Sequence, residues 1–309
     1  MSSTHKTYQV AEHRYLNFCK SFSLRPLPTS EEVLCYFVAC LGQQGLAHTS
    51  IRTYLSGVWQ LQIAHGFKDP GIDQMPRLRQ MLKGVKVERG KEGKVPRPRL
   101  PITPSILRKL KSVWLSSDSS FNPLMLWAAA LVTFFSFCRS GEITVEDEKK
   151  YDPKTHLSFA DVTVDNAVSP SVISLNIKYS KTDQGRVGVR VILGRTGDDL
   201  CPVLALLNYL SKRGSKPGAL FQWEDGIPLS KTKFVEATRQ ALTAAQLPAK
   251  DYAGHSFRIG AATTAAMAGL EDSAIQTLGR WKSSSYQLYI RMYPQQLAAM
   301  SSSLSKCNI

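Results

Sequence analysis

Residues 123–138 form an apolar run that ends directly on Arg139. A transmembrane helix needs about 20 consecutive apolar residues, whereas this run is shorter and contains Thr133 and Ser136. We therefore expect a helix that is buried in the core of a folded domain. The short apolar run favours a globular protein over a membrane protein.

The chain is strongly basic, with a net charge of +15 and a pI of about 9.6. Lys and Arg exceed Asp and Glu both before and after residue 100, which favours a polyanion held between two halves. A basic soluble protein without such a partner is the alternative if charge alone is considered. With 309 residues, of which 43% are hydrophobic, the chain can build one large or two ordinary domains.

The cysteines and the amino terminus indicate the compartment. The six cysteines include no Cys-x-x-Cys pair and no Cys/His spacing that suits zinc. We expect buried free thiols in a reducing compartment, and neither a metal nor a cofactor. Residues 2–10 are polar, so neither a signal peptide nor a membrane partner is expected.

Residues 1–85 have the pattern of a helical domain. The first helix is marked by apolar residues three or four positions apart, at Tyr8, Ala11, Tyr15 and Phe18. Three further helices are expected at about 30–42, 49–65 and 74–85, the first of them capped by Ser30. Arg52 lies off the apolar face of its helix, so it is a candidate contact for a phosphate backbone.

Residues 86–101 differ from both flanking regions. Basic residues, including Lys94 and Arg97, alternate with Gly and Pro, and large apolar residues are nearly absent. This composition predicts a flexible basic linker. The linker either lies along DNA as a strap, with Lys94 and Arg97 as contacts, or is a solvated connector whose charges only aid solubility.

Residues 102–309 mix helices with a small sheet. The segments 172–179 and 186–193 are rich in β-branched residues and flank a turn at 182–185, which predicts a hairpin, and 161–165 adds a third strand. Helices are expected at 105–115, 122–138, 201–213, 230–246, 256–268 and 272–279, with a weak one at 295–306. The predicted fold is mainly α with a small antiparallel β-sheet, an α+β class.

Four residues near the carboxy terminus carry chemistry. His255 and Arg258 are three positions apart, so they share one face of a helical turn. Arg holds a phosphate through two parallel donors, and His moves protons near neutral pH. Trp281 and Tyr289 follow, and a tyrosine can act as a nucleophile that forms a covalent intermediate. These are the parts needed to cut a phosphodiester without a metal.

These motifs resemble those of the tyrosine recombinases, also called the phage-integrase family. The resemblance is sharp in His255-Ser256-Phe257-Arg258, Gly279-Arg280-Trp281 and Tyr289-Ile290-Arg291, and weaker in Cys138-Arg139-Ser140-Gly141-Glu142. The carboxy-terminal motifs are similar to those of recombinases from eukaryotic Crypton, DIRS and Ngaro mobile elements. The resemblance implies a DNA-clamping domain in 1–85, the linker 86–101 and a catalytic domain in 102–309. It also implies double-stranded DNA as the partner, in the nucleus of a eukaryotic host or otherwise on intracellular DNA.

The resemblance assigns catalytic roles to Arg139, Lys181, His255, Arg258, Trp281 and Tyr289. The two arginines would hold the non-bridging phosphate oxygens, His255 would carry the proton of the nucleophile, and Lys181 would protonate the leaving 5′ oxygen. Some alternatives remain open. Arg139 is otherwise a helix-end arginine paired with Glu142, and Lys178 or Arg186 could replace Lys181.

The chain departs from the family pattern in two places. The family usually has a Gly two residues before the first arginine, where this chain has Phe137, so the geometry of that turn is in question. The family also has a spacing of nine between the His/Trp position and the nucleophile, whereas Trp281 and Tyr289 are eight apart. Trp281 is alternatively a core residue, and Tyr286 and Tyr293 are alternative nucleophiles.

The expected activity is DNA strand cleavage and rejoining through a 3′-phosphotyrosyl intermediate, in site-specific recombination or integration of a mobile element. The resemblance implies four protomers on two DNA sites. Bond energy is conserved in the covalent intermediate, so ATP is not needed. Two alternatives are a catalytically silent DNA-binding protein derived from such an enzyme and a relaxing enzyme like the type IB topoisomerases.

Overall fold

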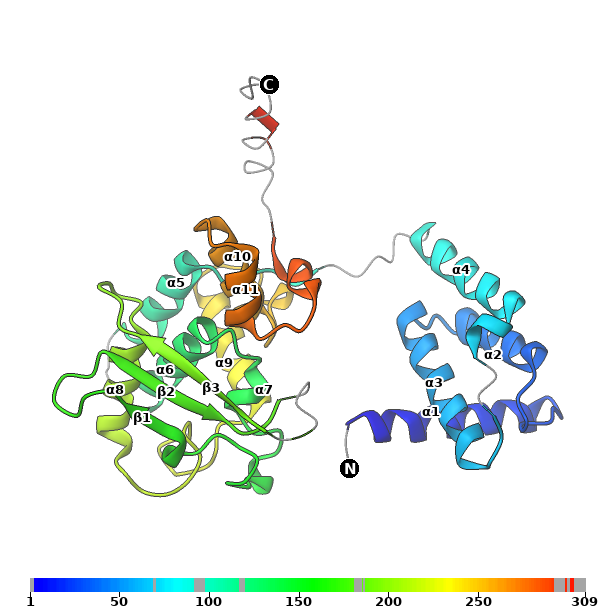
Figure 1. Ribbon diagram of the computed structural model, residues 1–309, viewed down its shortest axis with the longest axis horizontal. Helices are drawn as coiled ribbons and strands as arrows, with labels where there is room; N and C mark the ends of the chain where they lie inside the picture. Colours follow the sequence, from blue (N-terminus) through cyan, green and yellow to red (C-terminus); the bar gives the residue numbers. More distant parts are fainter. Residues whose placement is uncertain are drawn as a thin grey trace. The chain divides into compact units, whose positions relative to one another are not determined.

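The computed structural model describes residues 3–68, 71–91, 98–116, 120–180, 185, 187–291, 298 and 301–302. Contacts divide the chain into two compact units, Met1–Arg97 and Pro98–Ile309, which Figure 1 shows as a helical unit and a mixed unit. The prediction of a mainly α fold with a small antiparallel sheet is confirmed. No helix in the described ranges is both long and apolar enough to cross a membrane.

The described residues of the first unit form four α-helices around one apolar core. Ser30 caps the second helix as predicted, because its Oγ accepts a hydrogen bond from the Val33 N–H at 3.3 Å. Tyr15 and Phe37 pack edge to face in the core, with ring centroids 5.2 Å apart. The helices are α1 (Ser3–Ser21), α2 (Glu31–Gln43), α3 (His48–Ala64) and α4 (Pro76–Lys91), with a short 3₁₀ turn η1 (Ile72–Gln74) before α4.

The range predicted as a linker, 86–101, is more ordered at both ends than expected. Helix α4 continues to Lys91, because no proline interrupts its sequence after Pro76. At the other end, the Leu100 N–H donates to the Asp251 carbonyl at 3.0 Å, which attaches this segment to the second unit. Lys94 and Arg97 lie outside the described residues, and the three-domain division remains a prediction.

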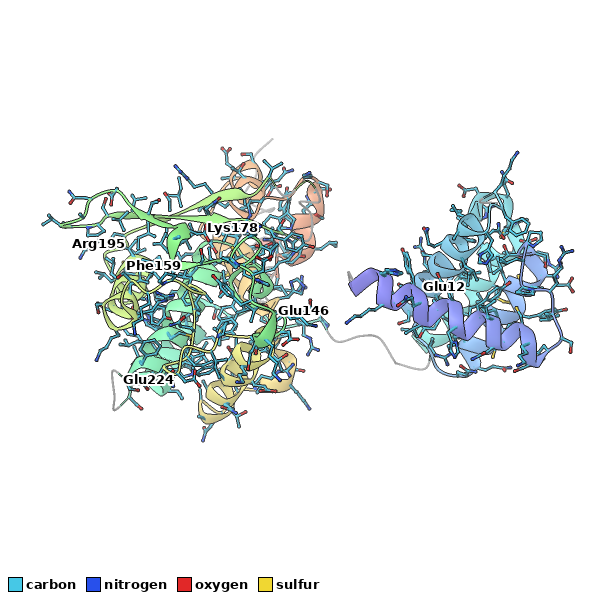
Figure 2. All side chains as sticks on the ribbon, turned by 90° about the horizontal axis from the view of Figure 1, so that it is seen from below. Glu12, Glu146, Phe159, Lys178, Arg195 and Glu224 are labelled. Atoms are coloured by element: carbon cyan, nitrogen blue, oxygen red, sulfur yellow. The ribbon has the colours of Figure 1, made fainter. Side chains whose placement is uncertain are left out.

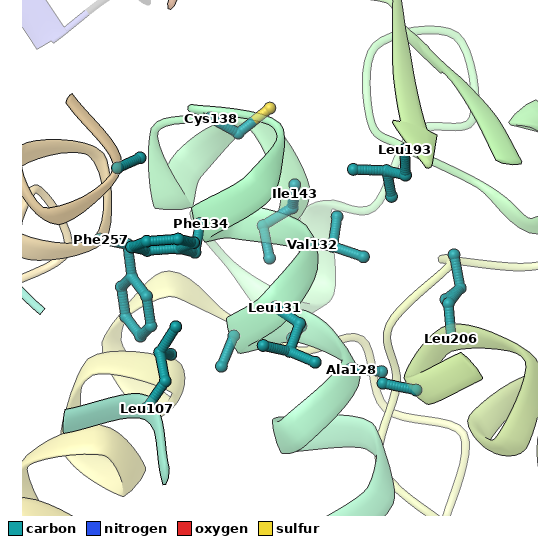
Figure 3. Close-up of a cluster of buried hydrophobic side chains, with 14 of the residues drawn as sticks. Leu107, Ala128, Leu131, Val132, Phe134, Cys138, Ile143, Leu193, Leu206 and Phe257 are labelled. Carbon is teal, nitrogen blue, oxygen red and sulfur yellow. The ribbon is translucent and has the colours of Figure 1, made fainter. Parts of the chain in front are cut away.

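Helix α6 (Phe121–Phe135) is the centre of the second unit. Every residue from Leu124 to Phe134 is buried, which confirms the core helix expected from the apolar run. Figure 3 shows its Ala128, Leu131, Val132 and Phe134 among side chains from the surrounding elements, namely Leu107, Leu193, Leu206 and Phe257. Those elements are α5 (Pro104–Trp114), α8 (Pro202–Arg213), α10 (Ser256–Met267) and strand β3 (Val189–Gly194).

The sheet has three antiparallel strands in the order β1-β2-β3. Val162 pairs with Leu175, and Leu175 pairs with Val191. The second strand ends two residues earlier than predicted, at Ile177, and the side chain of the next residue, Lys178, pairs with Asp161 at 2.6 Å. The remaining elements are β1 (Val162–Val164), β2 (Val172–Ile177), α7 (Ser140–Ile143), α9 (Lys231–Ala244), α11 (Asp272–Gly279) and the 3₁₀ turns η2 (Glu148–Lys150), η3 (Phe159–Asp161), η4 (Ala249–Asp251) and η5 (Ser284–Tyr289).

Phe137 explains why α6 ends earlier than the predicted residue 138. Its backbone is left-handed, with φ 52°, and the N–H groups of Phe137 and Cys138 donate back to Phe134 and Thr133 at 3.0 and 3.1 Å. This is a Schellman motif, which usually has glycine at the left-handed position. The phenylalanine ring is 6% exposed and packs edge to face on Trp281. The Gly of the family pattern is therefore replaced by a residue that takes the same backbone conformation and also fills the core.

We expect Phe137→Gly to lower the free energy of unfolding despite the relief of the left-handed backbone. Loss of a buried phenylalanine costs about 3–5 kcal/mol, whereas a left-handed residue other than glycine costs about 1–2 kcal/mol. The net loss should be roughly 2–3 kcal/mol, and Phe137→Ala, which keeps the backbone cost, should lose about 1 kcal/mol more. Denaturant unfolding measures both variants. A Phe137→Gly protein as stable as the wild type would contradict this account.

Candidate active site

Arg139 follows the Schellman turn of α6 and occupies the N-cap of the short helix α7. Glu142, three residues later, accepts the Arg139 N–H at 3.1 Å, which is one half of a capping box. Its other oxygen accepts the Arg139 guanidinium at 2.9 Å. The pairing with Glu142 that the sequence left as an alternative is therefore present, but Arg139 also lines a cleft of about 700 Å³ beside His255. Both roles are compatible, because one arginine carries several donors.

Arg258 is buried inside the unit, with 1% of its surface exposed. Its guanidinium donates to the Gly279 carbonyl at 2.6 Å and to the Phe137 carbonyl. It also lies over the ring of Trp281, 4.1 Å from the centroid, and 5.6 Å from that of Tyr289. Arg258 thus joins the turn before Arg139 to the turn before Tyr289, two segments that are far apart in the sequence.

Helix α10 carries Arg258 and approaches its neighbours very closely. A Cβ on Gly260 would lie 1.8 Å from the Ile102 carbonyl oxygen, so only glycine fits there. The same holds at Gly279, where a Cβ would lie 1.5 Å from the Trp281 ring. These contacts give a physical reason for glycine at both positions and fix where Arg258 and Trp281 lie.

Helix α11 ends in a second Schellman motif, with Arg280 at the left-handed position (φ 58°). The Arg280 guanidinium donates to Glu142 at 2.8 Å and to the Ser136 carbonyl at 2.9 Å. The guanidiniums of Arg139 and Arg280 therefore share the carboxylate of Glu142. The Arg258 guanidinium lies close enough for the charges of all three to affect its pKa. We call these four residues the arginine cluster.

The arginine cluster carries two positive charges in excess, and the pKa of Arg258 reflects this. Burial, followed by the neighbouring charge of Arg139, lowers the pKa of Arg258 from its ordinary value to about 10. Because this pKa lies below the ordinary one, the charged guanidinium costs stability at every pH below about 10. A bound anion would offset that cost, so the site is suited to a phosphate.

Tyr289 lies at the end of η5, against α10. The buried hydroxyl of Thr263 donates to its carbonyl at 3.2 Å and accepts the Arg291 N–H at 3.0 Å. The Tyr289 ring is partly exposed, 5.2 Å from the Trp281 ring and 6.4 Å from the His255 ring between centroids. The phenol, the imidazole and the Arg258 guanidinium thus meet at one place.

Tyr286, the alternative nucleophile, has different surroundings. It is buried, and its hydroxyl bonds to the Asp272 carboxylate, which raises its pKa. A raised pKa opposes formation of the phenolate that attacks phosphorus. The third tyrosine, Tyr293, lies outside the described residues.

The predicted lysine site is only partly visible. Tyr179 and Ser180 line the cleft, and the next residue, Lys181, lies outside the described residues, as does Arg186. Lys178, which Figure 2 labels, is occupied by Asp161 at 2.6 Å and by the Pro153 carbonyl at 2.6 Å. Lys178 is therefore a poor substitute for Lys181 as a proton donor.

Trp281 serves the core and remains available to the site. It is buried against Phe137 and beneath Arg258. Trp281 is therefore a packing residue, the alternative that the sequence left open. Its indole N–H has no hydrogen-bond partner among the described residues, which leaves one donor for a ligand. The described residues contain no group of three His, Cys, Asp or Glu that could hold a metal ion.

Sequence reasoning missed two residues of this site. Arg280 has no role of its own in the Gly279-Arg280-Trp281 motif, although it is the residue nine positions before Tyr289. This spacing of nine, which the family has before its nucleophile, could have pointed to Arg280. Thr263 gave no signal, because its contact with the Tyr289 backbone depends on how two distant segments pack.

We expect inorganic phosphate to stabilise the second unit through the arginine cluster. At ten times its dissociation constant, a ligand that binds only the folded state adds roughly 1.4 kcal/mol, or a rise in Tm of about 3–5 °C for a unit of this size. The measurement is thermal unfolding in phosphate and in chloride at equal ionic strength. Arg139→Gln should lose the extra stabilisation, and an equal rise in that variant would show a general salt effect instead.

Comparison with known proteins finds similar recombinases, although no family model matches the sequence. The sequence is 23% identical over 296 residues to an integrase/recombinase XerD homolog from Selenomonas ruminantium, covering 91% of this chain and 79% of that protein.

Solved structures share the fold at lower identity. The XerH site-specific recombinase bound to a palindromic difH substrate superposes with a TM-score of 0.62, 16% identity, and coverage of 96% of this chain and 78% of that one. The Tn1549 transposon integrase in complex with circular intermediate DNA gives a TM-score of 0.55, 15% identity, and coverage of 89% and 86%. The chain therefore shares its fold with a site-specific recombinase and a transposon integrase, and its sequence is similar to that of one integrase/recombinase.

Proposed function

We propose that the protein cleaves and rejoins double-stranded DNA, with Tyr289 as the nucleophile. The observation that carries this proposal is the position of Arg258, which contacts the Tyr289 ring and shares the Phe137 turn with Arg139. A phosphate placed between the two guanidiniums would lie within reach of the phenol. Fixed guanidiniums stabilise the charge that develops on the phosphorane, and they need little rearrangement to do so.

The proposed reaction is a transesterification that balances without a cofactor. The Tyr289 Oη attacks the phosphorus, the bond from phosphorus to the 5′ oxygen breaks, and a 3′-phosphotyrosyl bond forms. His255, whose ring lies beside that of Tyr289, accepts the phenolic proton. Lys181 donates a proton to the leaving 5′ oxygen. Attack by the 5′ hydroxyl of another strand reverses the step.

The biological process that we propose is site-specific recombination or integration of a mobile element. Support comes from the similar proteins, whose names describe an integrase/recombinase, a site-specific recombinase and a transposon integrase. The resemblance of the Gly279-Arg280-Trp281 and Tyr289-Ile290-Arg291 motifs to Crypton, DIRS and Ngaro recombinases further suggests a eukaryotic element that acts in the nucleus. By the same resemblance, four protomers would assemble on two DNA sites.

The alternatives differ in what they require of Tyr289. A silent DNA-binding descendant needs no nucleophile, yet the phenol lies at the arginine cluster with a partly exposed ring. A relaxing enzyme of the topoisomerase type uses the same chemistry but acts as a monomer. Relaxation of supercoiled plasmid at concentrations where the protein is monomeric would favour that second alternative.

We expect the wild-type protein to form a covalent adduct with nicked suicide DNA that carries its recombination site. Tyr289→Phe should abolish the adduct, because it removes the attacking oxygen while keeping the ring that packs on Trp281. Tyr286→Phe is the matched control and should retain the adduct. Denaturing gel electrophoresis of labelled DNA gives the result. Loss of the adduct in Tyr286→Phe alone would reassign the nucleophile.

We also expect DNA binding to depend steeply on salt, because a basic protein displaces counterions from many phosphates. Arg52 is exposed on α3, and Arg52→Gln should reduce the slope of log K against log salt by about 1. Arg25→Gln is a matched control in the same unit, because the Arg25 Nε already donates to the Leu27 carbonyl at 2.9 Å. Fluorescence anisotropy over a salt series measures the slopes. A flat response of the wild type would contradict the proposed DNA clamp.

A further inference from the structure

Arg280 is the member of the arginine cluster to which the family resemblance gives no role. It lies nine positions before Tyr289, the spacing that the family has between two catalytic positions, whereas Trp281 lies eight before it. Its backbone is left-handed, with φ 58° and ψ 39°, a conformation for which glycine is the favoured residue. The backbone alone therefore gives no reason for an arginine here, and the reason must be sought in what its side chain contacts.

Arg280 and Arg139 divide the carboxylate of Glu142 between them. The Arg280 guanidinium takes Oε2 at 2.8 Å, and the Arg139 guanidinium takes Oε1 at 2.9 Å. The side chain of Glu142 is 4% exposed, so solvent cannot compete for either oxygen. An arginine next to a carboxylate otherwise tends to form two parallel hydrogen bonds with it.

Removal of Arg280 would change how Arg139 is held. The Oε2 atom would keep only the backbone N–H of Arg139 at 3.1 Å, and it could then accept a second N–H from the same guanidinium. A bidentate pair of this kind would turn the fork of Arg139 toward Glu142 and away from the cleft that Arg139 lines. It would also halve the positive excess of the cluster, from two charges to one.

We propose that Arg280 is a positioning residue that keeps Arg139 available for the scissile phosphate by occupying one oxygen of Glu142. This inference rests on the proposed function, because it assigns the phosphate to the cleft beside Arg139. The transition state of the proposed reaction carries more negative charge than the bound phosphodiester. Arg280 should therefore affect the rate of cleavage more than the affinity for DNA.

A purely structural role for Arg280 is the competing explanation. Its second contact, with the Ser136 carbonyl at 2.9 Å, joins the end of α11 to the end of α6 and would act as a brace. A brace predicts loss of stability on substitution, and no recovery when Glu142 is also changed. The positioning role predicts recovery, because neutralising Glu142 removes the group that would capture Arg139.

The test is single-turnover cleavage of nicked suicide DNA by four variants. Arg280→Gly suits the left-handed backbone and should slow cleavage at saturating DNA by about 10- to 100-fold, less than the loss of a direct oxyanion donor. The DNA concentration for half-maximal rate should change little. Arg280→Lys, which keeps the charge, should be intermediate, and the double variant Arg280→Gly/Glu142→Gln should recover most of the rate.

Arg108→Gln is the matched control, because Arg108 pairs with Asp199 at 3.0 Å away from this cluster, and it should cleave at the wild-type rate. Thermal unfolding of each variant reports whether it is folded. Wild-type cleavage by Arg280→Gly would overturn the proposal. A folded double variant that is as slow as the single variant would overturn it as well.

A second readout does not depend on DNA chemistry. The stabilisation of the second unit by inorganic phosphate should shrink in Arg280→Gly and return in the double variant. If the wild-type protein forms no adduct, the proposed function fails, while the phosphate measurement still tests the positioning role. Equal stabilisation of the wild type and Arg280→Gly by phosphate would refute that role by itself.

Discussion

The buried carboxylate of Glu142 is the interaction on which the rest of the site depends. It joins the end of α6, through Arg139, to the end of α11, through Arg280, although these segments are more than a hundred residues apart. Removing one partner of a buried ion pair typically costs about 3–5 kcal/mol, because the other charge remains buried and unpaired. The two turns that carry the catalytic candidates are therefore joined by these ion pairs as well as by Arg258, which bonds a carbonyl in each turn.

The arginine cluster carries more positive charge than its one carboxylate can balance. Arg258 is desolvated, and its partners are two carbonyl oxygens and the rings of Trp281 and Tyr289. Hydrogen bonds from a charged donor contribute about 1.5–3 kcal/mol each, and a desolvated cation–π contact about 2 kcal/mol. Burial of the ion costs several kcal/mol in return. The lowered pKa of Arg258 indicates that burial outweighs these contributions, so a negatively charged ligand would offset the remaining cost.

Much of the fold was predictable because its local signals agree with the tertiary structure. The apolar run 123–138 was too short to span a bilayer and so predicted a core helix, and the Ser30 hydroxyl supplied the acceptor that the start of α2 needs. The segments rich in β-branched residues predicted the hairpin of the sheet. The ends of elements were less predictable, because they depend on contacts made at a distance. Phe137 ends α6 in a conformation usually left to glycine, and the ring that compensates for this packs on Trp281, 144 residues later.

The sequence predicted which residues form the candidate site, but it did not predict which of them contact one another. The motifs identified Arg139, His255, Arg258, Trp281 and Tyr289, and the structure brings their elements together in the second unit. The motifs did not reveal that Arg258 bonds the Phe137 carbonyl or that Arg280 shares Glu142 with Arg139. Such contacts arise from the crossing of α10 and α11 with the end of α6, and no local pattern encodes that crossing.

The central claim is that the arginine cluster activates one particular phenol toward a DNA phosphate. Its most direct test is peptide mapping by mass spectrometry after the wild-type protein is trapped on suicide DNA and digested with nuclease. The account predicts a nucleotide mass on the peptide that contains Tyr289, at that residue and no other. A nucleotide on Tyr286 or Tyr293, or on a peptide from another part of the chain, would contradict it.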